Sequence, residues 1–154
     1  VGERFSYLWR QMDAVEISKM FTDSGDMRHP DGTIERGRDT IRQNRMELFN
    51  KREYRGSNHP VTLSDIRCLA GGVAVADGRW ELRLEEEATS GAPARNLGPG
   101  RRHSGYCTLV VTKAGDAWMI QAWRYTVNPP DGTQPPTTLK QPGFIGRGGG
   151  PPQF

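Results

Sequence analysis

The sequence contains few of the residues that mark disulfide-bonded, metal-binding or membrane proteins. Its 154 residues include only two cysteines, Cys68 and Cys107, and three histidines. Neither cysteine has a second cysteine or a histidine at metal-ligand spacing, so we expect two buried free thiols rather than a disulfide or a zinc site. No run approaches the roughly 18 apolar residues that a membrane-spanning helix needs, which predicts no membrane partner.

An excess of one charge is also missing. The chain has 21 basic and 18 acidic residues, for a net charge of +3, and the basic residues are scattered among acidic ones. A nucleic-acid-binding domain more often concentrates its basic residues in one stripe, so we predict no nucleic-acid partner. Because the chain opens at Val1 rather than methionine, the compartment stays open. The two alternatives are a cytoplasmic protein, and a secreted or periplasmic protein from which an upstream signal peptide was removed.

The first part of the chain has helical periodicity. Residues 3–12 place apolar side chains on one helical face, namely Phe5, Leu8, Trp9 and Met12. Residues 13–21 predict a second helix, in which Asp13 and Glu16 match an N-cap and its partner three residues later. Gly25 is expected to end this helix.

A short hairpin and a third helix follow. Residues 26–29 and 33–36 predict two short strands joined by a "PDG" turn. Residues 37–49, "GRDTIRQNRMELF", predict a helix with the acidic Asp39 in its first turn.

Strand-forming residues dominate the rest of the domain. Four segments rich in β-branched and aromatic residues predict strands at 59–69, 72–84, 104–113 and 117–127. Helices followed by a strand meander indicate an α+β domain with helices on one face of an antiparallel sheet. We therefore expect one domain over residues 1–127. Residues 128–154 are rich in proline and glycine and predict a tail that cannot bury enough apolar surface to fold alone.

This order of elements resembles the nuclear transport factor 2-like superfamily, and within it the SnoaL-like and ketosteroid isomerase-like branch. The resemblance is carried by "DAVEISKMFTDSGDMRHPDGTIERGRDTI", "GVAVADGRWEL" and "TLVVTKAGDAWMIQAW", and it covers roughly residues 5–127. It implies a cystatin-like α+β fold, in which a curved antiparallel sheet forms a cone around three N-terminal helices. It also implies an apolar pocket for a small hydrophobic ligand and a homodimer through the convex face of the sheet.

Alternation along the last predicted strand adds detail to this expectation. One face carries Trp118, Ile120, Ala122, Arg124 and Thr126, and the other carries Met119, Gln121, Trp123, Tyr125 and Val127. Because both faces hold large apolar groups, we predict that Trp123 and Tyr125 form the homodimer interface. We predict that the pocket is lined by Phe5, Trp9, Met12, Phe21, Trp80, Trp118 and Ile120.

The candidate catalytic residue is His29. The resemblance places it where ketosteroid isomerases have a general base, an aspartate directly before a proline at the end of the first strand. A neutral imidazole can accept a proton near pH 7. The structural alternative, an imidazole bonded to a backbone carbonyl, stays open. The places of the family's oxyanion-binding tyrosine and protonated aspartate fall near Phe5 and near Cys107 or Thr108. Classical steroid isomerisation is therefore not expected.

Two further residues complete the candidate set. Asp26 is an alternative base, and Arg124 or Tyr125 is expected to steady a developing oxyanion. The structural interpretations are a turn residue for Asp26 and an ion pair of Arg124 with Glu81 or Asp77. The functional hypothesis is an isomerase, cyclase or hydratase acting on an apolar carbonyl compound. Its alternative is a non-catalytic hydrophobic-ligand-binding or dimerisation module. We expect no cofactor, because no glycine-rich dinucleotide fingerprint occurs.

Overall fold

A computed structural model of the chain describes residues 1–84 and 102–128. The helices are α1 (Gly2–Arg10), α2 (Ala14–Lys19), α3 (Arg38–Phe49) and the short 3-10 helix η1 (Arg52–Tyr54). The strands are β1 (Phe21–Arg28), β2 (Ile34–Arg36), β3 (Val61–Leu69), β4 (Val73–Arg83), β5 (Arg102–Ala114) and β6 (Ala117–Tyr125). The polar link between β4 and β5 and the predicted tail beyond Asn128 lie outside the described residues. Of the helices in the described part, none is long and apolar enough to cross a membrane.

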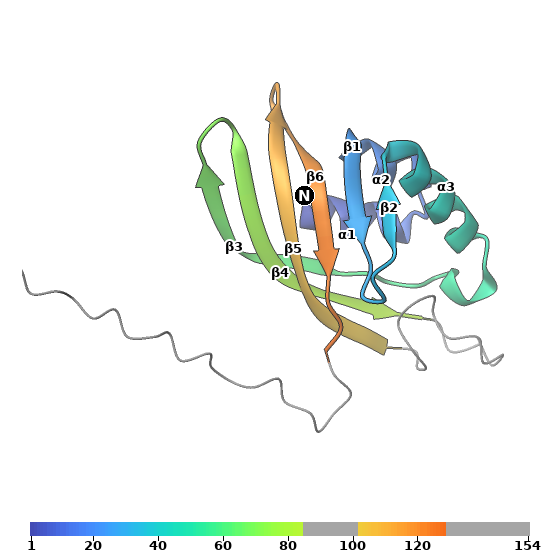
Figure 1. Cartoon of the computed structure of the whole chain (residues 1–154). Coiled ribbons are helices and arrows are strands. Elements are labelled where there is room, and N and C mark those ends of the chain that lie inside the picture. The colour runs from blue at the N-terminus through green and yellow to red at the C-terminus, as the bar shows by residue number, and fades with distance from the viewer. Residues whose placement is uncertain (85–101, 129–154) are drawn as a thin grey trace, which may run out of the picture.

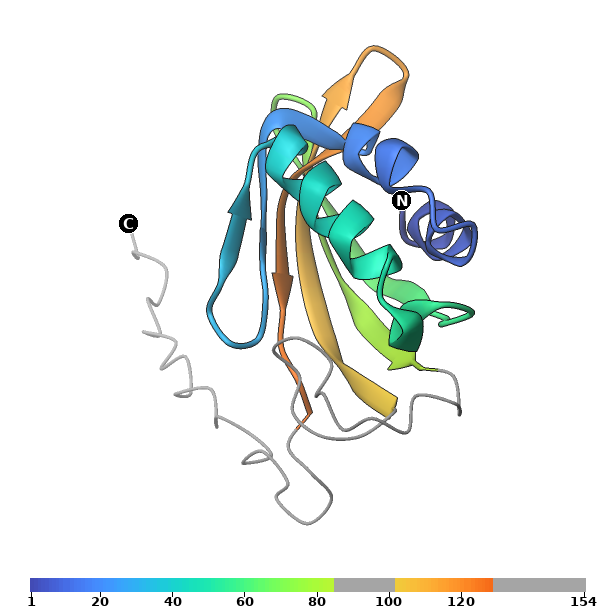
Figure 2. The ribbon, with the colours of Figure 1, turned by 90° about the vertical axis from the view of Figure 1, so that its right-hand side faces the viewer.

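The six strands form one curved, open sheet in the order β2-β1-β6-β5-β4-β3. Figures 1 and 2 show the three helices gathered on the concave side of this sheet, with α3 alongside the β1–β2 hairpin. This confirms the predicted α+β class. One detail of the prediction is corrected, because β1 and β6 run parallel while the other neighbours are antiparallel. Local periodicity does not encode the direction in which distant strands pair.

The core lies between the helices and the concave face of the sheet. Its fully buried side chains include Phe5, Ile17, Phe21, Ile41, Leu109 and Trp123. The rings of Phe5 on α1 and Trp123 on β6 lie 4.6 Å apart between centroids, so the first helix packs directly on the centre of the sheet. Burying each such side chain contributes roughly 1.5–3 kcal/mol relative to leaving it exposed.

The prediction that Gly25 ends the second helix is wrong. The helix α2 stops at Lys19, and Gly25 lies inside the strand β1 that begins at Phe21. A Cβ atom on Gly25 would lie 2.7 Å from the carbonyl oxygen of Ile120 on β6. The glycine is therefore needed for the close approach of two strand backbones. A glycine at this place in the sequence is compatible with either role, ending a helix or allowing strands to approach, so the sequence alone did not distinguish them.

The predicted dimer interface at Trp123 and Tyr125 is wrong. These side chains are 0% and 9% exposed and face the core. The reason is a register shift between β5 and β6, where Val111 pairs with Ile120 and Val110 with Ala122, which leaves Gln121 as an extra residue. Such a bulge reverses the alternation of side chains beyond it. Ile120 and Trp123 therefore point to the same face, three residues apart.

The capping interaction predicted at the second helix is present and can be tested. The Asp13 carboxylate accepts a hydrogen bond of 2.9 Å from the backbone N–H of Glu16. We expect Asp13→Ala to lower the free energy of unfolding by about 0.5–2 kcal/mol, because that N–H loses its partner. Urea denaturation measures the change, with the exposed Glu47→Ala on α3 as the control. Equal stabilities of the two variants would contradict a capping role for Asp13.

Candidate functional site

A cavity of about 260 Å³ lies between α3, the β1–β2 turn and the concave face of the sheet. Its apolar wall includes Trp9, Leu48, Trp80 and Leu82. Its polar lining includes His29, Glu35, Arg45, His59 and Tyr125. Ionisable side chains from a turn, a strand and a helix therefore meet at one apolar cavity.

The turn after β1 fixes the position of His29. The backbone N–H of His29 donates to the Thr33 carbonyl at 2.9 Å, and the Gly32 N–H donates to the His29 carbonyl at 2.9 Å. Gly32 has φ +89°, a conformation that favours glycine, so the "PDG" turn is set by its own residues. His29 thus sits at the end of β1, at the wall of the cavity.

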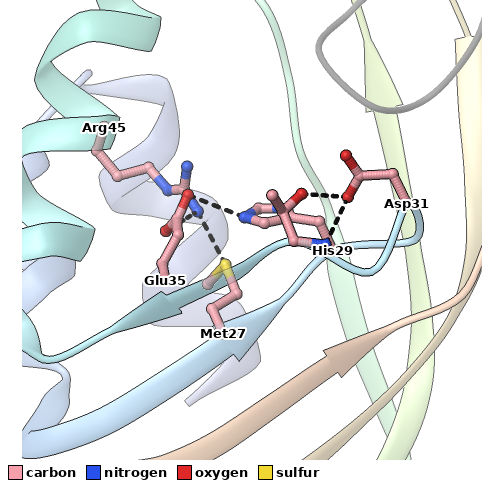
Figure 3. Close-up of polar contacts among 6 residues, drawn as sticks. Met27, His29, Asp31, Glu35 and Arg45 are labelled. Atoms are coloured by element: carbon pink, nitrogen blue, oxygen red, sulfur yellow. Dashed lines mark hydrogen bonds and ion pairs between the residues drawn. The ribbon is translucent and has the colours of Figure 1, made fainter.

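Three side chains form a chain of contacts at this wall, which Figure 3 shows. His29 Nε2 lies 2.9 Å from Oε1 of Glu35. The other carboxylate oxygen, Oε2, accepts a hydrogen bond of 3.1 Å from Nη2 of Arg45. Glu35 faces this way because it pairs with the buried Met27 in the β1–β2 register, and paired residues share a face.

Glu35 is held in its ionised form. Burial acts to raise the pKa of its carboxyl, but the Arg45 guanidinium and the hydrogen bond to His29 outweigh burial, so the pKa lies below its ordinary value. An ionised carboxylate only accepts hydrogen bonds, so Nε2 of His29 must carry the hydrogen. Neutral His29 therefore has its free lone pair on Nδ1, the nitrogen that remains able to accept a proton.

His59 and Tyr125 are electrically neutral groups of the wall. Burial lowers the pKa of His59 to about 3, and the nearby Arg45 charge adds to this effect. Burial also raises the pKa of Tyr125 well above its ordinary value, so the phenol keeps its hydrogen. The Tyr125 ring stacks on the His29 ring with 6.3 Å between centroids and an angle of 15°.

The predicted pocket wall is only partly the observed one. Of the seven residues predicted to line it, Trp9 and Trp80 line the cavity, while Phe5, Phe21 and Ile120 pack in the core. Met12 lies in the connection between α1 and α2, partly buried against the core. Trp118, near the β5–β6 turn, is 38% exposed. Helical and strand spacing identifies buried faces, but it does not distinguish filled core from cavity wall.

Asp26 and Arg124 do not belong to this site, which corrects their predicted catalytic role. They form an ion pair with each other across β1 and β6 and do not line the cavity. Asp26 is the strand neighbour of the core-facing Met27, so it points to the opposite, convex face. The alternative partners proposed for Arg124 were also wrong, since Glu81 pairs with Arg83 and Arg102.

The sequence interpretation missed Glu35, Arg45 and His59. One available signal was Arg45, which lies four residues after Ile41 and four before Phe49, on the apolar face of the third predicted helix. A charged residue on such a face must find a partner or line a cavity. Within residues 1–84 and 102–128, no cluster of three His, Cys, Asp or Glu side chains could hold a metal ion.

Comparison with known proteins identifies the fold. No protein-family model and no curated protein matches the chain. Solved structures do match. An uncharacterized protein with a cystatin-like fold from Caulobacter vibrioides aligns with a TM-score of 0.66 at 20% identity, covering 84% of this chain and 85% of its own.

Two other solved structures agree. An NTF-2 like protein of unknown function from Shewanella oneidensis MR-1 aligns with a TM-score of 0.63 at 18% identity, covering 80% of this chain and 91% of that one. A domain of unknown function with a cystatin-like fold from Nostoc punctiforme gives a TM-score of 0.65 at 17% identity, covering 82% and 72%. The chain therefore has the cystatin-like, nuclear transport factor 2-like fold.

Proposed function

We propose that the protein is a small enzyme of the isomerase or cyclase type that removes a proton next to the carbonyl group of an apolar compound. His29 is the base. The observation that carries this proposal is the hydrogen bond between His29 and the ionised Glu35 at the wall of an apolar cavity. His29 also occupies the place of the general base in the ketosteroid isomerase-like and SnoaL-like proteins that the sequence resembles.

Glu35 gives His29 what a base in an apolar site requires. It fixes the ring orientation and the tautomer, which leaves Nδ1 to accept the proton. When the imidazole becomes an imidazolium, the adjacent carboxylate stabilises the new positive charge, as in other histidine–carboxylate pairs. Arg45 keeps Glu35 ionised and in place throughout.

The cavity favours a small, flat and mainly apolar substrate. Its volume of about 260 Å³ is slightly below the usual range for ligand pockets, which begins at about 300 Å³. Aromatic rings of Trp9, Trp80 and Tyr125 supply much of its wall. Classical steroid isomerisation is not proposed, because Phe5 has no hydroxyl group and both Phe5 and Cys107 are buried in the core, outside the residues that line the cavity. Neither residue donates a hydrogen bond to an oxyanion in this cavity.

A non-catalytic ligand-binding module is the second candidate. It is favoured by the neutral His59, whose ring lies among Trp9, Trp80 and Tyr125 with centroid distances of 4.7, 5.6 and 5.9 Å. A pure binding site, however, has no need of an ion pair held next to a histidine. Convergence of His29, Glu35 and Arg45 on one cavity therefore favours catalysis.

The catalytic proposal can be tested without knowing the substrate. The probe is 2-indanone, a neutral bicyclic ketone, whose exchange of α-hydrogen for deuterium in D2O is followed by proton NMR. We expect the protein to accelerate exchange saturably, and His29→Gln to abolish the acceleration. Glu35→Gln should reduce it by roughly 10²–10⁴-fold, the usual contribution of a positioned acid–base group.

Asp26→Asn is the matched control, since Asp26 is on β1, the strand that leads to His29, but faces away from the cavity. It should leave exchange unchanged. Saturable binding of 2-indanone without faster exchange would favour the ligand-binding module. Equal exchange by the parent protein and His29→Gln would remove His29 from catalysis.

Buried His59 predicts a specific loss of stability in acid. Its pKa is about 3 in the folded protein and ordinarily about 6.5, so the unfolded chain binds the proton first as the pH falls. The contribution of neutral His59 to the free energy of unfolding is therefore fully present above pH 6.5. It is lost between pH 6.5 and about 3, by up to about 1.4 kcal/mol per pH unit. His59→Phe removes this contribution, so its unfolding free energy should depend less on pH between 6.5 and 4. Parallel pH profiles in urea denaturation would contradict a buried neutral His59.

We also propose that the protein is a homodimer, with the convex face of the sheet as the interface. Tyr106 on this face is 51% exposed, with the Arg79 guanidinium 5.4 Å from its ring centroid. Sedimentation at micromolar concentration should show a dimer for the parent and a monomer for Tyr106→Glu, with Glu47→Gln as the control. A monomeric parent protein would contradict the proposal.

A further inference from the structure

Arg45 is a buried cation whose donors are incompletely used. The residue is 3% exposed and lines the cavity from α3. Its two hydrogen bonds, to Oε2 of Glu35 and to the thioether sulfur of Met27, both come from Nη2. Its Nε is buried without a partner, and Nη1 makes no hydrogen bond with residues that the structure describes. Figure 3 shows the guanidinium above the Met27 sulfur and beside Glu35.

This arrangement is costly unless it serves a ligand. A guanidinium has five N–H donors, and a thioether sulfur is a weak acceptor for one of them. Leaving donors of a buried charged group unused costs free energy, whereas an oxygen acceptor in the cavity would recover it. A structural ion pair alone would need only Glu35.

We propose that Arg45 binds the carbonyl oxygen of the substrate and stabilises it as an enolate oxyanion when His29 removes the α-proton. This inference rests on the proposed function and names its substrate class, which is a neutral, enolisable ketone or ester small enough for the cavity. Arg45 supplies the electrophilic group that neither Phe5 nor Cys107 provides.

The charges balance through the step. The C–H bond breaks, its proton goes to Nδ1 of His29, and its electron pair forms the carbon–carbon double bond of the enolate while the charge moves to oxygen. Before the step the cavity holds Arg45 as a cation, Glu35 as an anion and a neutral His29. Afterwards the imidazolium offsets the enolate. In a substrate with a β,γ carbon–carbon double bond, return of the proton from Nδ1 to the γ-carbon moves the double bond to the α,β position, which completes an isomerisation and needs no oxidant or reductant.

The same balance predicts how stable anions bind. A carboxylate in contact with Arg45 resembles the enolate, but it lies close to the Glu35 carboxylate. Its binding should therefore be coupled to protonation of His29. The charged and titratable groups around His29 are Glu35 on β2, Arg45 on α3, Tyr125 on β6, Asp31 in its own turn and the buried neutral His59 before β3. An imidazole is the side chain of this kind that ordinarily changes charge near neutral pH, so the added proton is expected on the His29 ring.

The test compares 2-naphthoate with its neutral isostere 2-acetylnaphthalene by calorimetry at pH 8. We expect the parent protein to bind 2-naphthoate at least roughly tenfold more tightly than 2-acetylnaphthalene, because one charge-assisted hydrogen bond supplies a free-energy difference of that size. Repeating the titration in phosphate and Tris buffers should show uptake of about one proton with 2-naphthoate and none with the ketone. His29→Gln should abolish the proton uptake.

Variants separate the role of Arg45 from its contribution to folding. Glu35→Gln combined with Arg45→Met removes both buried charges together, which avoids leaving either one unpaired. This double variant should bind the two probes equally. Glu35→Gln alone should keep the preference for 2-naphthoate. Arg42→Gln, one turn earlier on the same helix and paired with Asp39, is the matched control and should behave as the parent.

Each outcome decides between the proposals. No preference for 2-naphthoate in the parent, or a preference that survives in the double variant, overturns the assignment of Arg45. If the assignment of Arg45 is overturned but the protein still accelerates 2-indanone exchange, His29 acts as the base without help from Arg45. If 2-naphthoate is preferred but exchange is not accelerated, Arg45 is an anion-binding group, and both the enolate step and the catalytic proposal fail.

Discussion

The ion pair between Arg45 and Glu35 joins the elements that form the cavity. It connects α3 to the short strand β2, and through Oε1 of Glu35 it reaches the turn that carries His29. Both charged side chains are buried, so removing one partner is expected to cost about 3–5 kcal/mol by leaving the other charge without compensation. The ion pair is therefore a condition for the orientation of the His29 ring, for the tautomer of His29 and for the polar character of an otherwise aromatic cavity.

The curved sheet supplies the second constraint. Close approach of β1 to β6 at Gly25 and the extra residue Gln121 in β6 together decide which side chains face the helices. As a result Trp123 packs under Phe5, while Tyr125 continues along the same face and stacks near His29. The apolar core and the polar corner of the cavity are thus parts of one concave surface of the sheet.

Much of the fold was predictable because its elements follow local rules. Helical spacing placed α1 and α3, the Asp13 cap placed the start of α2, and β-branched segments placed β3 to β6 within a few residues. The position of His29 at the end of the first strand was also predictable, from its place before Pro30 and the turn. The partners of His29 were not, because Glu35 and Arg45 are ordinary charged residues until the hairpin register and the apolar face of α3 are considered together.

Local sequence was sufficient for the class of fold and for the site of the candidate base, since periodicity, capping and turn chemistry act within a few residues. Strand direction, the bulge at Gln121 and the cavity depend on pairings between residues far apart in the chain, such as Phe21 with Ile120. These pairings turned Trp123 and Tyr125 inward and Arg124 outward, the reverse of uninterrupted alternation along β6. A single extra residue reverses a strand's faces, so the assignment of side chains to cavity or surface required the tertiary structure.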